Sequence, residues 1–413
     1  MTLDLVITNA RLRGYSGTLD VGIAGGRIVA IEPGIIADAP RENVDGRLLA
    51  PGLVECHIHL DKADLLGRAP IVDGTLAEAV RETARLKAGF TVEDVYARAA
   101  RTVERAIGHG TMAMRSFVEI DPRAGLRSFE ALKAVRADYA QMIDIEICAF
   151  VQEGLSNEPE TEALLITALQ DGADLIGGCS YTDPDPAGHI SRIFDLAERF
   201  GVAADFHVDF DLDPAGSDLP TIIAETERRG WQGRVAVGHA TKLSAWPVAE
   251  VDAIGMRLAE AGIAVVALPA TDLFLLGRQS EVLTPRGIAP LARLARAGVA
   301  TAVASNNVLN PFTPFGDGNL VRMANLFANV AQLADDASLD WCFDMISTIP
   351  AAIMGRSANL RVGAPADMIL LDANDAASAI RSIAPALAGW RGGRKTFERT
   401  GPALLFAAEP PLA

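Results

Sequence analysis

Residues 52–60 read GLVECHIHL and form the first of eight apolar, β-branched segments in this chain of 413 residues. Stretches with apolar residues at helical spacing follow these segments, as in residues 76–107, 128–139 and 190–200. The eight segments cover residues 52–60, 111–120, 143–152, 175–180, 202–209, 234–239, 263–268 and 300–305. Eight strand–helix units over about 250 residues are typical of a closed parallel (β/α)8 barrel, or TIM barrel.

An open doubly wound sheet is the alternative, because it has the same alternation of strands and helices. Polar side chains stand at the ends of the first, fifth, sixth and eighth segments. The carboxyl ends of these four strands converge on one mouth only if the sheet closes. We therefore favour the barrel.

The two ends of the chain predict a second, smaller unit. Residues 5–8, 19–23 and 27–31 are short β-rich runs, and the last two are separated by a Gly25-Gly26 turn, which is typical of antiparallel hairpins. Helical patterns at 320–333 and 339–354 follow the barrel, and then strands are expected after the turn at 362–367 and at 394–398. We expect residues 1–50 and 358–413 to form a β-sandwich and residues 51–357 to form the barrel.

Composition limits the partners. The chain has 53 acidic against 37 basic residues, a net charge of −16, which opposes binding to nucleic acid or to an anionic membrane surface. The sequence has no apolar stretch of about 18 residues, and its four cysteines are scattered without a CxxC pair. We expect a cytoplasmic protein that acts on a small molecule, with homo-oligomerisation left open.

The pair His57 and His59 is the first candidate for chemistry. The period of two in a strand places both imidazoles on one face, with Ile58 on the other. Two imidazoles at this spacing can bind one zinc or iron ion. The alternative is that both rings only fill the barrel core.

Other strand ends favour a metal centre over core packing. The fifth segment offers Asp205, His207 and Asp209 on one face, and the sixth ends at His239. The eighth is followed by Asn306 and Asn307, so these groups are expected at the mouth with the first pair. By contrast, His109 precedes the second segment and His189 begins a helix, so we expect structural or surface roles for both.

The run LAPGLVECHIHLDK at residues 49–62 resembles the first-strand signature of the amidohydrolase superfamily, and within it the cytosine deaminase-like branch. VQEG at residues 151–154 is similar to the segment with which cytosine deaminases read their substrate. GAPAD at 363–367 is similar to the motif where such chains return to the β-sandwich. The first strand also resembles that of N-isopropylammelide amidohydrolases.

This resemblance implies one divalent metal ion, zinc first and iron or manganese as alternatives, with His57, His59 and His207 as ligands. It implies that His239 contacts the activated water and that Gln152 binds the amide edge of a heterocycle. Asn306 stands where the family has a metal-binding aspartate that also takes a proton, and Asn307 where a second acid is common. Phe210 stands where cytosine deaminases have a glutamate that shuttles protons.

These substitutions require another proton carrier. Asp209 is the first candidate because it shares a face with His207, His239 is the second and Asp61 the third; a position of Asp209 behind His207, orienting its ring, is equally open. Asn306 is retained as a weak oxygen ligand. For substrate binding we expect Gln152, Asn307, Lys62 (toward an anionic group, unless it pairs with Asp61) and Phe210 (as a stacking wall, unless it is a core residue).

The sequence thus predicts a metal-dependent hydrolase of a C–N bond in or on a small nitrogen heterocycle or cyclic amide, with cytosine itself disfavoured. The alternative is a catalytically weakened relative that binds a small ligand without turnover. Asn306 and Phe210 favour the alternative, whereas the four histidines retained at one mouth oppose it.

Overall fold

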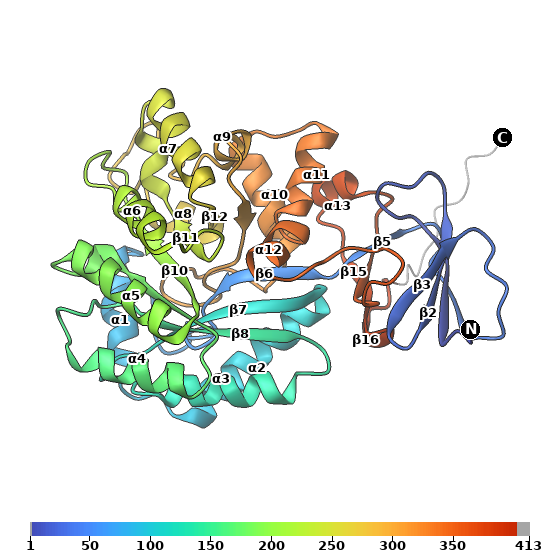
Figure 1. The fold of residues 1–413 in the computed structure, drawn as a ribbon, viewed down its shortest axis with the longest axis horizontal. Helices are drawn as coiled ribbons and strands as arrows, with labels where there is room; N and C mark the ends of the chain where they lie inside the picture. Colours follow the sequence, from blue (N-terminus) through green and yellow to red (C-terminus); the bar gives the residue numbers. More distant parts are fainter. Residues whose placement is uncertain (1, 403–413) are drawn as a thin grey trace.

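Residues 2–402 are described by a computed structural model whose central element is an eight-stranded parallel sheet. Its strands follow one another in chain order around the sheet (Figure 1). All eight predicted segments are confirmed, as β6 Leu53–Ile58, β7 Thr111–Glu119, β8 Asp144–Val151, β9 Leu175–Cys179, β10 Ala203–Val208, β11 Val235–His239, β12 Ile263–Ala267 and β13 Thr301–Val303.

The sheet closes between its first strand and the residues after its last. Ile58 and Asn306 form a parallel bridge. The backbone N–H of His59 donates to the carbonyl of Asn306, and the N–H of Asn306 donates to the carbonyl of His57, both at 2.8 Å. The predicted barrel is therefore confirmed, and the residues that close it are the same ones that the sequence places at the site.

Helices surround the barrel (Figure 1). The helices between successive strands pack apolar residues on the outer face of the barrel, which explains why the strands are buried on both faces, whereas the helix at residues 376–382 packs on two other helices. The helices are α1 Leu76–Lys87, α2 Val92–Gly108, α3 Arg127–Asp138, α4 Glu160–Gln170, α5 Pro186–Phe200, α6 Leu219–Arg229, α7 Val248–Glu260, α8 Pro269–Leu275, α9 Leu291–Arg296, α10 Leu320–Ala331, α11 Asp336–Asp344, α12 Thr348–Ile353 and α13 Ala376–Ser382, with short 3₁₀ turns η1 Ser180–Thr182 and η2 Thr241–Ala245.

Two stretches with one continuous helical pattern are each divided in the structure. The stretch 76–107 contains α1 and α2, because the chain turns at Gly89 and Thr91 caps α2 by accepting the N–H of Asp94. The stretch 339–354 contains the end of α11 and all of α12. Apolar spacing alone does not predict where one helix ends and the next begins, because both helices of a pair turn an apolar face to the same core.

The two ends of the chain meet in a pair of four-stranded sheets, at the right of Figure 1. One sheet has the order β3 (Arg27–Glu32), β2 (Leu19–Ala24), β1 (Leu5–Ala10), β4 (Arg41–Asn43). The other has the order β16 (Arg394–Glu398), β15 (Ala386–Arg391), β14 (Met368–Leu371), β5 (Leu48–Pro51). Ile7 and Val21 of the first share a buried apolar cluster with Met368 and Trp390 of the second.

This pairing confirms the predicted sandwich, although β4, β5, β15 and α13 are not apparent from the sequence pattern. The domain limits at residues 50 and 357 stay a prediction. Within residues 2–402, each helix is too short or too polar to cross a membrane.

Candidate metal and active site

Three histidine rings meet at the mouth of the barrel. His57 and His59 come from the end of β6, and His207 from the end of β10. The Nε2 atom of His207 lies 3.1 Å from Nε2 of His57 and 3.0 Å from Nε2 of His59. One ring nitrogen from each of the three histidines lies within 4.8 Å of the other two, the spacing of a group that can hold a metal ion.

All three rings are buried, and burial lowers the pKa of each imidazole well below 6.5. They are therefore neutral, and a neutral imidazole has a lone pair available for a metal. Gly238 of β11 makes room for the first ring, because a Cβ at this position would lie 2.6 Å from Cε1 of His57.

Asn306 lies beside the three rings with its backbone in the left-handed region (φ 61°), which asparagine tolerates. Its backbone is held on both sides by the bonds that close the barrel. Its Oδ1 atom is buried without a hydrogen-bond partner. A buried amide oxygen with no partner is costly, and a ligand at the site would satisfy it.

His239 ends β11, also with a positive φ of 70°. Its Nδ1 donates to Oδ1 of Asp272 at 2.7 Å, and Asp272 lies in α8 directly after β12. The His239 ring centroid lies 5.2 Å from that of His207 and 4.3 Å from that of Phe210. His239 is expected at the site from the sequence, whereas its carboxylate partner Asp272 is not.

These groups surround a narrow hollow at the C-terminal ends of the strands. Its free volume is about 10 Å³, roughly enough for one water molecule. Of the predicted site residues, eight of the ten line it: His59, His207, His239, Asn306, Gln152, Lys62, Phe210 and Asn307. Leu76, Tyr181, Thr271 and Phe312 complete the lining and were not predicted.

The hydrogen bonds of Asn310 fix the orientation of Asn307. Oδ1 of Asn310 accepts the N–H groups of Phe312 and Thr313, so its Nδ2 must donate. That Nδ2 donates to Oδ1 of Asn307 at 2.8 Å and to the carbonyl of Lys62 at 3.1 Å. Asn307 therefore has its own amide N–H groups left to offer to the hollow.

Gln152 follows β8 and is oriented from the opposite side. Its side-chain Nε2 donates to Sγ of Cys179 at 3.4 Å, and its backbone carbonyl accepts the hydroxyl of Thr182. The amide oxygen of the side chain is thus the atom left for a ligand. Gln152 and Asn307 together offer the hollow one acceptor and one donor.

Lys62 pairs with Glu119, not with Asp61 as one reading of the sequence allowed. Its Nζ lies 2.6 Å from Oε1 of Glu119 and 4.5 Å from the centre of the Phe312 ring. Although burial alone would raise the pKa of Glu119, the charges of Lys62 and Lys87 lower it to about 2. Much of the Lys62 charge is therefore already compensated.

Glu119, Asp121 and Glu153 form a second acidic group with metal-like spacing. The Nζ atom of Lys87 contacts all three carboxylates, at 3.0 Å from Glu119 and 2.5 Å from Glu153. A lysine ammonium in this position supplies the positive charge that an ion would bring. This group is therefore a buried ion-pair network.

Asp209 does not continue the alternation of β10, although the sequence pattern predicts that it does. The strand ends at Val208 and Asp209 has a φ of 52°, so it leaves the strand conformation. Its carboxylate accepts the hydroxyl of Ser217 at 2.5 Å and the N–H of Asp218 at 3.0 Å. Burial raises its pKa to about 6. A proton-carrying role for Asp209 stays a prediction that this geometry does not favour.

Asp61 is buried behind the site, where its Oδ2 accepts the N–H of Glu119 at 2.9 Å. Burial, and then the nearby charge of Glu119, raise its pKa to about 6. His189 is buried with Nδ1 3.2 Å from Asp183, and His109 caps the end of α2 with Nε2 3.8 Å from Asp317. Neither of these two histidines lines the hollow.

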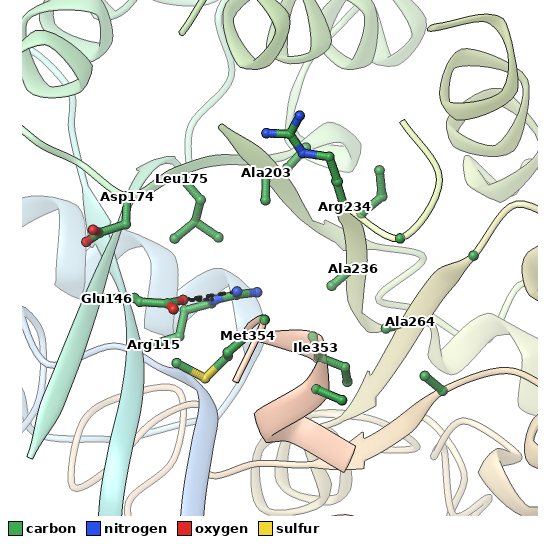
Figure 2. Close-up of a pocket in the computed structure, with 17 residues that line it drawn as sticks. Arg115, Glu146, Asp174, Leu175, Ala203, Arg234, Ala236, Ala264, Ile353 and Met354 are labelled. Atoms are coloured by element: carbon green, nitrogen blue, oxygen red, sulfur yellow. Dashed lines mark hydrogen bonds and ion pairs between the residues drawn. The ribbon is translucent and has the colours of Figure 1, made fainter. Parts of the chain in front are cut away.

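A larger hollow of about 570 Å³ lies at the opposite, N-terminal end of the strands (Figure 2). Figure 2 shows Arg115 bonded to Glu146, with Ala203, Ala236 and Ala264 along the wall. Arg115 is 3.0 Å from Glu146 and 3.0 Å from Asp205, so its charge is matched inside the protein. Barrel enzymes keep their chemistry at the other end, where the histidines meet.

Comparison of the sequence with known proteins shows the family of this chain. A family model described as "Amidohydrolase family" matches residues 93–397. A pterin deaminase of Rhizobium rhizogenes is 31% identical over 86% of this chain and 82% of its own length. An N-isopropylammelide isopropyl amidohydrolase of a Pseudomonas species is 27% identical over 95% and 96%.

Among solved structures, a 5-methylcytosine deaminase from Klebsiella pneumoniae liganded with 5-fluorocytosine superposes with a TM-score of 0.92. It is 29% identical to this chain, and the match covers 97% of this chain and 99% of the other. The similarity therefore extends over both the barrel and the sandwich.

Proposed function

Because this chain belongs to the amidohydrolase family, we propose that it hydrolyses a carbon–nitrogen bond of a small nitrogen heterocycle or cyclic amide, with one divalent metal ion as cofactor. The observation that carries the proposal is the convergence of three neutral imidazole nitrogens at the barrel mouth. By their names, the two relatives act on carbon–nitrogen bonds, one as a deaminase and the other as an amidohydrolase.

The donor set fits a metal ion. Ligands at 2.0–2.1 Å in tetrahedral geometry lie about 3.3 Å apart, close to the 3.1 and 3.0 Å that separate Nε2 of His207 from Nε2 of His57 and of His59. One hydrogen bond cannot explain both contacts, because Nε2 of His207 has either one proton or one lone pair, and two Nε2 atoms approach it. We propose His57, His59 and His207 as ligands and the unpaired Oδ1 of Asn306 as a weaker fourth one.

Zinc is the metal we propose first, with iron or manganese as alternatives. A set of three imidazoles without a carboxylate is typical of catalytic zinc. A bound ion of this kind would act as a Lewis acid and lower the pKa of water to about 7. The residues around it would orient the substrate and move protons.

The lining of the hollow indicates the kind of substrate. Phe210, Phe312 and Tyr181 offer aromatic walls on which a planar ring can stack. Gln152 offers an acceptor and Asn307 a donor, a pattern that suits the amide-like edge of a nitrogen heterocycle. A ring of six atoms does not fit a free volume of about 10 Å³, so side chains at the mouth must move to admit it.

Three classes of reaction cleave a bond of this kind. Deamination, opening of a cyclic amide and removal of an N-alkyl group all place a nitrogen leaving group on an sp² carbon. We propose that cytosine is not the substrate, because Phe210 stands where cytosine deaminases have their proton-shuttling glutamate. We also propose a cytoplasmic location, which four free, buried cysteines support.

A second candidate function is ligand binding without turnover, which the asparagine at position 306 favours. An amide there accepts no proton at neutral pH, and general acid–base catalysis is worth about 10²–10⁴-fold in rate. The experiment is a screen of heterocyclic amines and cyclic amides with zinc, manganese or iron added, in which ammonia release and ring opening are both measured. Turnover that chelation abolishes supports the hydrolase, whereas saturable binding without turnover supports the second candidate.

A further inference from the structure

Asp272 is placed to control the chemistry of His239. Oδ1 of Asp272 accepts the Nδ1–H of His239 at 2.7 Å, and Oδ2 accepts the backbone N–H of Leu268 at 3.2 Å. Both oxygens of the carboxylate are therefore acceptors, and the carboxylate is completely buried. Asp272 lies in the helix directly after β12, and β12 is the neighbouring strand of β11, which ends at His239. Asp272 therefore supports the His239 ring from outside the hollow.

This contact fixes which nitrogen of His239 carries the proton. A carboxylate only accepts hydrogen bonds, so Nδ1 of the ring must be protonated. In the neutral ring Nε2 then has the lone pair. The ring lines the same hollow as His59, His207 and Asn306, so that lone pair belongs to the site.

The same hollow contains no side-chain carboxylate among the described residues. Asn306 and Asn307 are amides, and Phe210 is apolar. The Asp209 carboxylate is occupied by Ser217 and by the N–H of Asp218. Among the described residues that line the hollow, His239 is therefore the one that combines a free lone pair with a charged partner behind it.

We propose that Asp272 is a positioning residue that holds His239 in the Nδ1–H form, and that this pair carries the proton that a carboxylate carries in relatives with acids at the site. The inference rests on the proposed function, since it names the proton carrier of that reaction. His239 is the catalytic residue, and Asp272 acts through it.

The proton balance needs no other reactant. The water loses one proton to Nε2 of His239 as its oxygen bonds to the substrate carbon. The same Nε2 returns that proton to the nitrogen as the carbon–nitrogen bond breaks and the electron pair stays on the nitrogen. One water is consumed, and the ring of His239 returns to its starting form. Asp272 stabilises the cationic ring between the two transfers.

The first test is the tautomer of His239 in the wild-type protein. The chain has six histidines, and ¹⁵N-labelled imidazoles report which ring nitrogen is protonated. The signal of His239 is assigned by its loss in His239→Asn, in the zinc-loaded and in the metal-free protein. An Nδ1–H ring supports the proposal and an Nε2–H ring overturns it. This measurement requires no substrate, so it stands even if the proposed hydrolase function fails.

The second test is Asp272→Asn, which changes the charge and keeps the shape. We expect kcat to fall by about 10²–10⁴-fold, with KM and zinc content near those of the wild type. A kcat within a few fold of the wild type would overturn the proposal. Loss of zinc together with activity would also overturn it, because Asp272 would then support the metal centre. Asp252→Asn, at a surface ion pair with Arg293, is the control for replacing an aspartate.

Discussion

The Nε2 atoms of His59 and His207 lie 3.0 Å apart, although 148 residues separate them in the chain. This distance is set by the barrel, because β6 and β10 lie on opposite parts of the sheet and turn their ends toward one mouth. Burial keeps both rings neutral and so prevents charge repulsion between them. Two neutral imidazole nitrogens at this distance can bind one cation together.

Gly238→Ala should weaken the metal site without contacting the metal. The new Cβ would lie 2.6 Å from Cε1 of His57, so the ring must shift or the strands must separate. Overpacking of this kind costs about 1–3 kcal/mol. We expect zinc affinity, measured by competition with a chelator, to fall at least about tenfold, as this energy would give.

Gly108→Ala is the matched control, since a Cβ at Gly108 meets nothing within 4 Å and the residue ends α2. It should leave zinc affinity unchanged. Equal zinc affinities for Gly238→Ala and Gly108→Ala would show that the position of His57 does not depend on this contact.

Asn306→Asp distinguishes the two candidate functions. Aspartate also tolerates the left-handed backbone at this position, so the fold should be retained. Because a carboxylate binds a divalent ion more strongly than an amide, we expect slower loss of metal to a chelator. If His239 carries the proton, kcat should stay within a few fold. A gain of about a hundredfold would contradict this account and indicate a catalytically weakened site.

Asp209→Asn tests the proton carrier that the sequence alone favours. Both oxygens of Asp209 are acceptors for residues 217 and 218, and an amide can accept through only one. We therefore expect a lower melting temperature and a smaller effect on kcat than in Asp272→Asn. If kcat falls as far as in Asp272→Asn while the melting temperature is unchanged, the proton role returns to Asp209.

Glu119→Gln should destabilise the protein. It leaves Lys62 and Lys87 buried without one of their shared partners, and breaking a buried pair costs about 3–5 kcal/mol. The pKa of Glu119 is lowered from 4.5 to about 2, so between these values the unfolded chain binds more protons than the folded one. The stability that Glu119 contributes is complete above pH 4.5 and is lost as the pH falls toward 2.

Urea unfolding of both proteins between pH 7 and pH 3 measures this contribution. The difference between wild type and Glu119→Gln should be largest at neutral pH and should shrink as the pH falls. The surface variant Glu398→Gln should lie within about 0.5 kcal/mol of the wild type throughout. A difference that is constant with pH would show that the charge of Glu119 is not what stabilises the fold.

The barrel and much of the site could be predicted because they depend on local periodicity. Strand alternation places His57 and His59 together, and the order of the eight segments brings His207 and His239 to the same mouth. The prediction fails where a strand ends. Asp209 does not share the face of His207 because its φ is positive, and the sequence pattern does not predict this backbone conformation.

Partners from distant segments were missed for a related reason. Asp272 meets His239 through a helix after the next strand, and Glu119 at the end of β7 meets Lys62 after β6 and Lys87 at the end of α1. The signals available were weak: a lone aspartate after the seventh apolar segment, and a lysine within a helical pattern. Only the packing of the barrel shows that these charges are buried and therefore must be paired.

The most direct measurement is the metal content of the purified protein and of His207→Ala, set against hydrolysis of the best heterocycle from the screen. The account predicts close to one divalent ion per chain, almost none in His207→Ala, and activity that chelation removes and zinc restores. A metal-free wild-type protein that still hydrolyses its substrate at the full rate would contradict it.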